Sequence, residues 1–262
     1  MIPYIGGKSY LVSWIISQFP EDYKTRSYIE VFGGGGWILY KKERSNLEIY
    51  NDLNSNLVNL FRTIRDNYEE FKHRAEWSLH SREMYQEARA KLKDDDFLND
   101  IEKAMHIAIA QVQSFSGKGG WGYAVSANRM TNGKWLPFLR RLEVINARLK
   151  HVQIECLDFE KLIKKYDSEN ALFYIDPPYV GAEHYYDTDT NKFRLEDHKR
   201  LAKLLKNIKG KFVLSYYENK LVRELYKDFK IITKQTSKHS AGVTKQSGIK
   251  VKPKAIELLV MN

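Results

Sequence analysis

Short apolar segments rich in β-branched and aromatic residues recur along the chain. Those with the length of a strand cover residues 27–32, 47–50, 152–156, 171–175, 211–216, 229–233 and 255–260. Most are separated by segments with apolar residues at helical spacing, namely 8–19, 159–166 and 196–207. Strands that alternate with helices predict an α/β fold with a mainly parallel, doubly wound sheet.

One interval interrupts this alternation. Between Tyr50 and Val152 lie about a hundred residues without a convincing strand, whereas a simple crossover unit needs about 30 residues. Helical spacing is present in residues 57–64, 84–92, 101–112 and 138–149. We therefore predict that residues 54–150 form a mostly helical insert, and that residues 1–53 and 151–262 form the α/β domain around it.

The insert contains one irregular stretch, from Ser114 to Trp135. It combines five glycines with aromatic residues such as Trp121 and basic residues, which are Lys118, Arg129 and Lys134. Glycine, aromatic and basic residues in one loop favour a surface that another molecule approaches closely. The alternative is a long loop that its own tryptophans attach to the core.

Composition and charge narrow the class of protein. A hydrophobic share of 43% and a charged share of 29% are typical of a globular chain and exclude a disordered one. The single cysteine, Cys156, excludes a disulfide framework and a thiolate zinc cluster, and it favours an intracellular protein. No apolar run approaches the roughly 20 residues that span a bilayer, and we expect no signal peptide before the first motif. The histidines lack convincing ligand spacing, so we expect no metal.

The formal charge of +10 favours a polyanionic partner. Residues 234–254 contain no acidic residue and include Lys245, Lys250 and Lys252. Because this segment lies between two predicted strands, we expect a long basic hairpin loop that contacts phosphates. A lysine-rich loop that is simply solvated is the alternative.

A glycine run stands where the first strand is predicted to turn into a helix. Residues Glu30-Val-Phe-Gly-Gly-Gly-Gly-Trp37 let the backbone approach a ligand closely. The spacing excludes a dinucleotide fingerprint, and the early Gly6-Gly-Lys-Ser9 lacks the strand and leading glycine of a P-loop. Asp52 ends the next strand, at a position where an acid accepts hydrogen bonds from ribose hydroxyls. Together they favour a nucleoside ligand, although Asp52 alone could instead cap the following helix.

The most specific motif is Phe173-Tyr-Ile-Asp-Pro-Pro-Tyr179, an apolar strand that ends abruptly. Asp176 supplies a carboxylate and Pro177 a carbonyl, and Pro178 stiffens the turn beside the ring of Tyr179. An exocyclic amine can donate its two N–H groups to these two acceptors while its ring stacks on the tyrosine. The motif therefore predicts a site for a flipped base.

In this order, the motifs resemble those of the Dam-type (D12 class) adenine-N6 DNA methyltransferases. The resemblance covers nearly the whole chain and comprises residues 4–8, 30–36, 51–54, 157–159, 176–179 and 256–262. It implies a Rossmann-like seven-stranded sheet and S-adenosylmethionine as the methyl donor. Tyr4 stands where many members carry Trp, and Ser215-Tyr-Tyr217 differs from the usual Ser-Asn pair. The insert does not clearly match the recognition sequence of GATC-specific members, which leaves the DNA target open.

The resemblance also implies roles for single residues. Asp52 would hold the donor's ribose, Asp158 its adenine amine, and Phe32 and Phe159 its apolar surroundings. Tyr4 and Lys8 would close the site near the methionine end, where Lys8 can pair with the carboxylate. The full set of donor-binding residues is then Tyr4, Lys8, Glu30, Phe32, Gly33, Gly35, Asp52, Asp158, Phe159 and Asp176.

The expected function is methyl transfer to the N6 amine of a flipped adenine in double-stranded DNA. The irregular stretch from Ser114 to Trp135 would then read DNA bases, and residues 234–254 would contact phosphates. A methyltransferase that acts on RNA or on a protein amide is one alternative, and a catalytically silent nucleic-acid-binding module is another. We expect a cytoplasmic protein of bacterial or phage origin, a monomer or weak dimer, with a cognate restriction endonuclease as a conceivable partner.

Overall fold

A computed structural model describes residues 2, 4, 7–114, 123, 134–183, 192–237 and 254–262. Within these residues, none of the helices combines the length and the apolar character that a membrane span requires.

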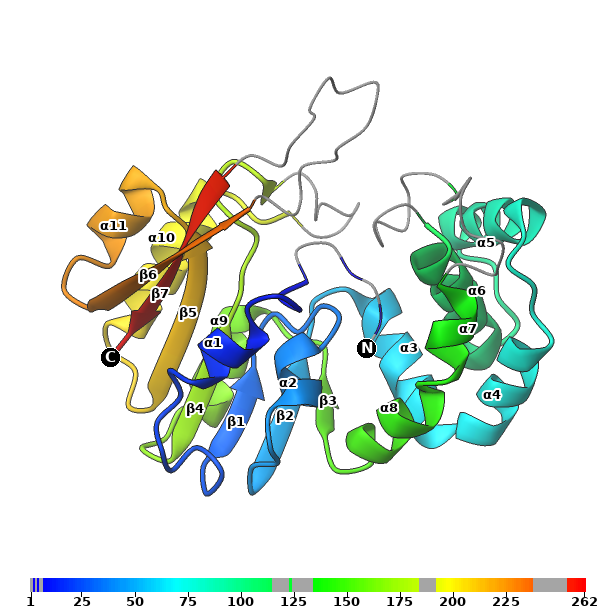
Figure 1. The fold of residues 1–262 in the computed structure, drawn as a ribbon, viewed down its shortest axis with the longest axis horizontal. Helices are drawn as coiled ribbons and strands as arrows, with labels where there is room; N and C mark the ends of the chain where they lie inside the picture. The colour runs from blue at the N-terminus through cyan, green and yellow to red at the C-terminus, as the bar shows by residue number, and fades with distance from the viewer. Residues whose placement is uncertain are drawn as a thin grey trace. The chain divides into compact units, whose positions relative to one another are not determined.

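A seven-stranded sheet forms the centre of the α/β architecture (Figure 1). Its strands are β1 (Ser27–Glu30), β2 (Leu47–Asn51), β3 (Gln153–Glu155), β4 (Ala171–Ile175), β5 (Lys211–Tyr217), β6 (Lys230–Ser237) and β7 (Lys254–Met261). The strand order is β3-β2-β1-β4-β5-β7-β6. Strands β2, β1, β4 and β5 run parallel, and β7 runs antiparallel between β5 and β6. The prediction of a mainly parallel, Rossmann-like sheet is confirmed.

Helices connect these strands. They are α1 (Val12–Ile16), α2 (Trp37–Lys41), α3 (Ser55–Asp66), α4 (Tyr68–Glu76), α5 (Arg82–Asp94), α6 (Asp100–Val112), α7 (Trp135–Leu139), α8 (Leu142–Leu149), α9 (Phe159–Tyr166), α10 (Leu195–Leu205) and α11 (Lys220–Leu225). The helix expected over residues 8–19 is shorter, because tight turns close its last residues. The helix expected over residues 138–149 is divided by a turn in which the Arg141 N–H donates to the Phe138 carbonyl at 3.0 Å.

The chain divides into two compact units. Unit 1 comprises Met1–Gly7, Gly34–Lys41 and Asn54–Cys156, and unit 2 comprises Lys8–Gly33, Lys42–Leu53 and Leu157–Asn262. Unit 1 contains helices α2 to α8, whereas unit 2 contains every strand except β3. The role of residues 54–150 in target recognition stays a prediction.

Side chains on the strands of unit 2 alternate between two buried faces, as the period of two in a strand requires. On one face, Ile29 and Phe173 belong to a core cluster with residues of α9, α10 and α11. On the other face, the ring of Phe19 packs against Tyr28 and Tyr174, with centroid distances of 5.9 and 6.3 Å. Burial on both faces explains why these strands are nearly continuous apolar runs.

Polar side chains fix the ends of the helices in unit 1. Asn54, Ser81 and Asn99 each accept a backbone N–H in the first turn of α3, α5 and α6.

Trp135 is 1% exposed, and its indole N–H donates to the Ala75 carbonyl at 3.2 Å. Trp135 itself therefore belongs to the core. Residues 115–122 and 124–133 lie outside the described residues, so both interpretations of the irregular stretch stay predictions.

Candidate active site

Asp176 stands where β4 ends, after five consecutive buried residues. Its side chain is 18% exposed, and its Oδ1 accepts a hydrogen bond from the Lys8 ammonium at 2.8 Å. The same ammonium lies 3.7 Å from Oε1 of Glu257 on β7. One buried cation is thus shared by two carboxylates.

The ionisation of Asp176 reflects these surroundings. Burial raises the pKa of Asp176 from 3.8 to about 6, while Lys8 lowers it and the Glu257 carboxylate raises it further. Asp176 is therefore an ionised acceptor above about pH 6. The ammonium of Lys8 is the main group that keeps it in that form.

Tyr179 is fixed on several sides. Its side chain is 8% exposed, the Lys8 ammonium lies 4.4 Å from its ring centroid, and the Tyr217 ring meets it edge-to-face at 4.6 Å. Its hydroxyl donates to Glu257 and lies 2.9 Å from the Ser215 hydroxyl. Stacking of a flipped base on this ring stays a prediction.

Sequence reasoning assigned no role to Ser215 or Glu257. Both side chains are fully buried, and the Ser215 hydroxyl donates to Glu257 Oε1 at 2.5 Å. The available signal was an acid within the apolar segment 255–260. Buried acids usually have a specific partner, so this position indicated one.

The glycine turn follows β1 directly. A Cβ on Gly33 would lie 2.1 Å from the Tyr50 ring, and one on Gly35 would lie 2.6 Å from the Ile2 carbonyl. These two positions therefore require glycine for close packing within their own units. Glu30 precedes the turn, is 1% exposed, and accepts a hydrogen bond from the Tyr28 hydroxyl at 2.8 Å.

Asn51 joins the ends of neighbouring segments in unit 2. Its Nδ2 donates to the carbonyls of Val31 and Leu157 at 2.9 and 3.0 Å, and its Oδ1 accepts from the Leu157 N–H at 2.8 Å. Asp52 follows this anchored residue. The residue that caps α3 is Asn54, so the alternative interpretation of Asp52 as the cap of that helix is wrong.

An aromatic cluster accompanies the expected adenine-binding residues. The ring centroids of Phe32 and Phe159 are 5.8 Å apart, and Phe193 meets Phe32 edge-to-face at 5.7 Å. Asp158 caps α9 by accepting from the Glu160 N–H at 3.0 Å, and it also pairs with Arg200 at 2.9 Å. Asp158 thus combines a structural role with the predicted contact to an adenine amine.

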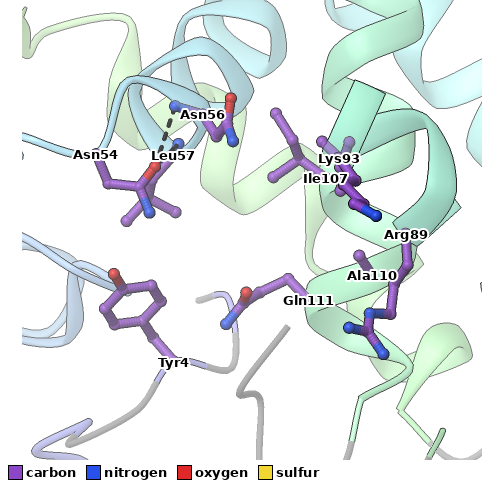
Figure 2. A pocket seen from close by; sticks show the side chains of 10 residues that line it. Tyr4, Asn54, Asn56, Leu57, Arg89, Lys93, Ile107, Ala110 and Gln111 are labelled. Carbon is purple, nitrogen blue, oxygen red and sulfur yellow. Dashed lines mark hydrogen bonds between the residues drawn. The ribbon is translucent and has the colours of Figure 1, made fainter. Parts of the chain in front are cut away.

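Tyr4 belongs to unit 1 and lines a pocket of about 270 Å³ in that unit. Figure 2 shows Tyr4, Asn54 and Gln111 around the same space as two basic side chains of α5, Arg89 and Lys93. None of the described residues that line the pocket is acidic. Arg89 and Lys93 are exposed, and neither has an acidic partner in the described part of the chain. The pocket therefore suits an anion.

Of the residues predicted to bind DNA, Lys134 is the one that the structure describes. Its ammonium donates to the Ser114 carbonyl at 3.2 Å, and burial lowers its pKa. The others lie outside the described residues: Lys118, Trp121, Arg129, Lys245, Lys250 and Lys252. The described residues contain no group of three or more His, Cys, Asp or Glu side chains that could hold a metal ion.

Comparisons with known proteins point to one family. Residues 4–239 match the D12 class of N6 adenine-specific DNA methyltransferases. The chain is 30% identical to the type II methyltransferase M1.LlaDCHI of Lactococcus lactis subsp. cremoris, over 99% of this chain and 93% of that protein. It is 24% identical to the DNA N-6-adenine-methyltransferase of Escherichia phage P1, over 86% of this chain and 30% of that protein.

Proposed function

The chain belongs to the D12 class N6 adenine-specific DNA methyltransferase family, and we propose that it uses S-adenosylmethionine to methylate a flipped adenine in double-stranded DNA. Methylation of adenine N6 in DNA is the activity that defines the family. The donor, the base flipping and the residue roles are the proposed parts. The observation that supports them best is the Asp176 carboxylate, which an ammonium partner holds at the end of β4.

The side chains of unit 2 have the chemistry that the donor requires. Asp52 follows β2 and offers a carboxylate for ribose hydroxyls, as acids at the ends of such strands do. The rings of Phe32 and Phe159 offer an apolar site for an adenine, and Asp158 an acceptor for its amine. When bound, S-adenosylmethionine supplies a methyl group activated by a sulfonium. The roles of Tyr4 and Gly35, in unit 1, rest on the family resemblance.

The chemistry of the amine explains the need for two acceptors. The lone pair of adenine N6 is delocalised into the ring, which makes the nitrogen a poor nucleophile. Asp176 and the Pro177 carbonyl would accept the two N–H groups, favour a pyramidal nitrogen and direct its lone pair towards the methyl group. Lys8 contributes by keeping the Asp176 carboxylate ionised. The residues thus act by positioning and electrostatics.

The test is the substitution Asp176→Asn, which preserves size and removes the charge. We expect methyl transfer to fall by about 100-fold or more, because a preorganised charge at the reacting atom is removed. Transfer of labelled methyl groups is measured on duplex DNA, RNA and protein side by side. Asp228→Asn is the control, since it removes an exposed acid of the same unit.

Wild-type turnover in Asp176→Asn would contradict the proposed role of Asp176 in methyl transfer. Labelled RNA or protein with unlabelled DNA would favour the alternative substrates. Equal losses in Asp176→Asn and Asp228→Asn would mean that the effect is a general change of charge.

A further inference from the structure

Glu257 is a buried residue of unit 2 whose contacts the proposed mechanism leaves unexplained. It lies on β7 opposite Tyr217 of β5 and is fully buried. Its Oε1 is close to three donors, which are the Tyr179 hydroxyl, the Ser215 hydroxyl and the Lys8 ammonium. Its Oε2 is buried without a hydrogen-bond partner. Burying a carboxylate oxygen without a hydrogen-bond partner costs free energy, so we expect Glu257 to have a function that offsets this cost.

We propose that Glu257 is a positioning residue for methyl transfer, which holds the Tyr179 hydroxyl and shares Lys8 with Asp176. This inference rests on the proposed role of Asp176. In this role, Glu257 does not contact the donor or the base. It acts through Tyr179, Lys8 and Asp176.

The distances around Lys8 support this role. Its ammonium lies 2.8 Å from Asp176, 3.7 Å from Glu257 and 4.4 Å from the ring centroid of Tyr179. One cation therefore locates two groups of the Asp-Pro-Pro-Tyr turn. Because Glu257 attracts the same cation, it limits how strongly Lys8 can bind Asp176. The Asp176 carboxylate then remains available to accept an N–H from the base.

The ionisation of Asp176 gives this proposal a measurable signature. Among the described residues, the titratable groups that interact with it come from four places. They are Lys8 before α1, Tyr174 and Tyr179 on and after β4, Tyr216 and Tyr217 on β5, and Glu257 on β7. Burial raises the pKa of each of these tyrosines, so they stay neutral. Within the described part of the chain, Lys8 and Glu257 therefore shift the pKa of Asp176 in opposite directions, Lys8 downwards and Glu257 upwards.

The main experiment is Glu257→Gln, which keeps the size of the side chain and removes its charge. The acid limb of kcat/KM for DNA, followed against pH, should move down by about half a pH unit or more, since a like charge beside Asp176 is gone. Affinity for S-adenosylmethionine should stay within about twofold. Ser215→Ala is the matched control, because it removes a hydroxyl partner of Glu257 without changing any charge.

A second variant, Glu257→Asp, keeps the charge and shortens the side chain. Here the acid limb should stay in place while kcat falls by about tenfold or more, because the shorter carboxylate loses its reach to the Tyr179 hydroxyl. This variant also tests the proposal if Glu257→Gln does not fold, which circular dichroism and thermal unfolding would reveal.

Two results would overturn the proposal. One is an acid limb of Glu257→Gln that coincides with that of wild type or of Ser215→Ala. The other is wild-type kcat in Glu257→Asp. The proposed function is tested separately, because Asp176→Asn should still lower methyl transfer by about 100-fold or more if the inference about Glu257 alone were wrong.

Discussion

At the scale of single residues, the pKa of Asp176 is set mainly by burial and by the charged groups beside it. A free aspartate is ionised well below neutral pH, whereas burial raises the pKa of Asp176 to about 6. Lys8 opposes that shift through a hydrogen bond of 2.8 Å. If Asp176 acts as proposed, the pH range of methyl transfer should therefore depend on Lys8 and on Glu257.

Replacing that lysine gives the first prediction at this scale. In Lys8→Gln, the pKa of Asp176 should rise because its stabilising cation is removed, so the acid limb of kcat/KM should move upwards by about one pH unit. A pH profile at saturating donor measures the shift. A limb that stays near pH 6 would contradict the pairing, and weaker donor binding would support the predicted contact of Lys8 with the methionine carboxylate.

Asp52 provides the second prediction. Asp52→Asn should weaken binding of S-adenosylmethionine by about 10-fold to 100-fold, since a charged hydrogen bond contributes roughly 1.5 to 3 kcal/mol. DNA affinity should not change. Calorimetry with the donor and a fluorescence assay with DNA distinguish the two effects. Unchanged donor affinity would reject the ribose contact.

The sequence predicted the polar residues that follow strands better than the side chains that hold those residues in place. Asp176 and Asp52 were visible because a polar residue follows an apolar strand. Asn51 and Glu257 were not identified, because their roles depend on segments distant in sequence, such as Leu157 and Tyr179. Long-range hydrogen bonds of this kind leave no periodic signal.

At the scale of elements, His198 links helix α10 to strand β5 and to the residues that follow the Asp-Pro-Pro-Tyr turn. His198 is 1% exposed, its Nδ1 lies 2.7 Å from the Tyr216 hydroxyl, and its Nε2 lies 3.2 Å from Glu183 Oε1. Glu183 follows the Asp-Pro-Pro-Tyr turn closely in sequence. Helix α10 thereby helps to fix the position of the chain after that turn.

The third prediction concerns stability and pH. Burial lowers the pKa of His198 below 6.5, so the unfolded chain binds this proton more readily than the folded one. Wild type should therefore lose stability as the pH falls from 6.5 towards the lower pKa of the folded state. His198→Gln should lack this part of the loss. Urea unfolding at several pH values measures both slopes, and parallel curves would contradict the assignment.

Helix boundaries were predicted less well than strands. Helix α4 was not expected, since it buries little more than Phe71 and Ala75 and so shows a narrow apolar stripe. The segment over residues 8–19 looked like a longer helix because its apolar residues are spaced suitably. Local turns nevertheless replace the helix at both ends of α1.

At the scale of the whole molecule, the charge of +10 makes DNA binding sensitive to salt. The sequence indicated this property but placed the basic contacts largely in segments that lie outside the described residues. Arg89 and Lys93 were not identified, because cations at helical spacing on α5 look like an ordinary solvated face. Only the pocket that they line distinguishes them.

The last prediction follows from that pocket. The double variant Arg89→Ala and Lys93→Ala should weaken binding to all DNA sequences alike and reduce the salt slope by about 0.9 for each phosphate that is no longer neutralised. Fluorescence anisotropy over a salt series measures both. The matched control removes Arg141 and Lys150, which are exposed cations of unit 1 outside the pocket. Equal effects in the two double variants would assign the weaker binding to net charge alone.

The division of the chain into interleaved units has a consequence for recombination between relatives. The chain passes from one unit to the other after Gly7, Gly33, Lys41, Leu53 and Cys156. A chimera that exchanges one continuous block, residues 54–156, would therefore leave two short pieces of unit 1 from the other parent. Exchange of target specificity should work best when residues 1–7 and 34–41 are exchanged together with that block. All residues that pack within unit 1 then come from the same parent.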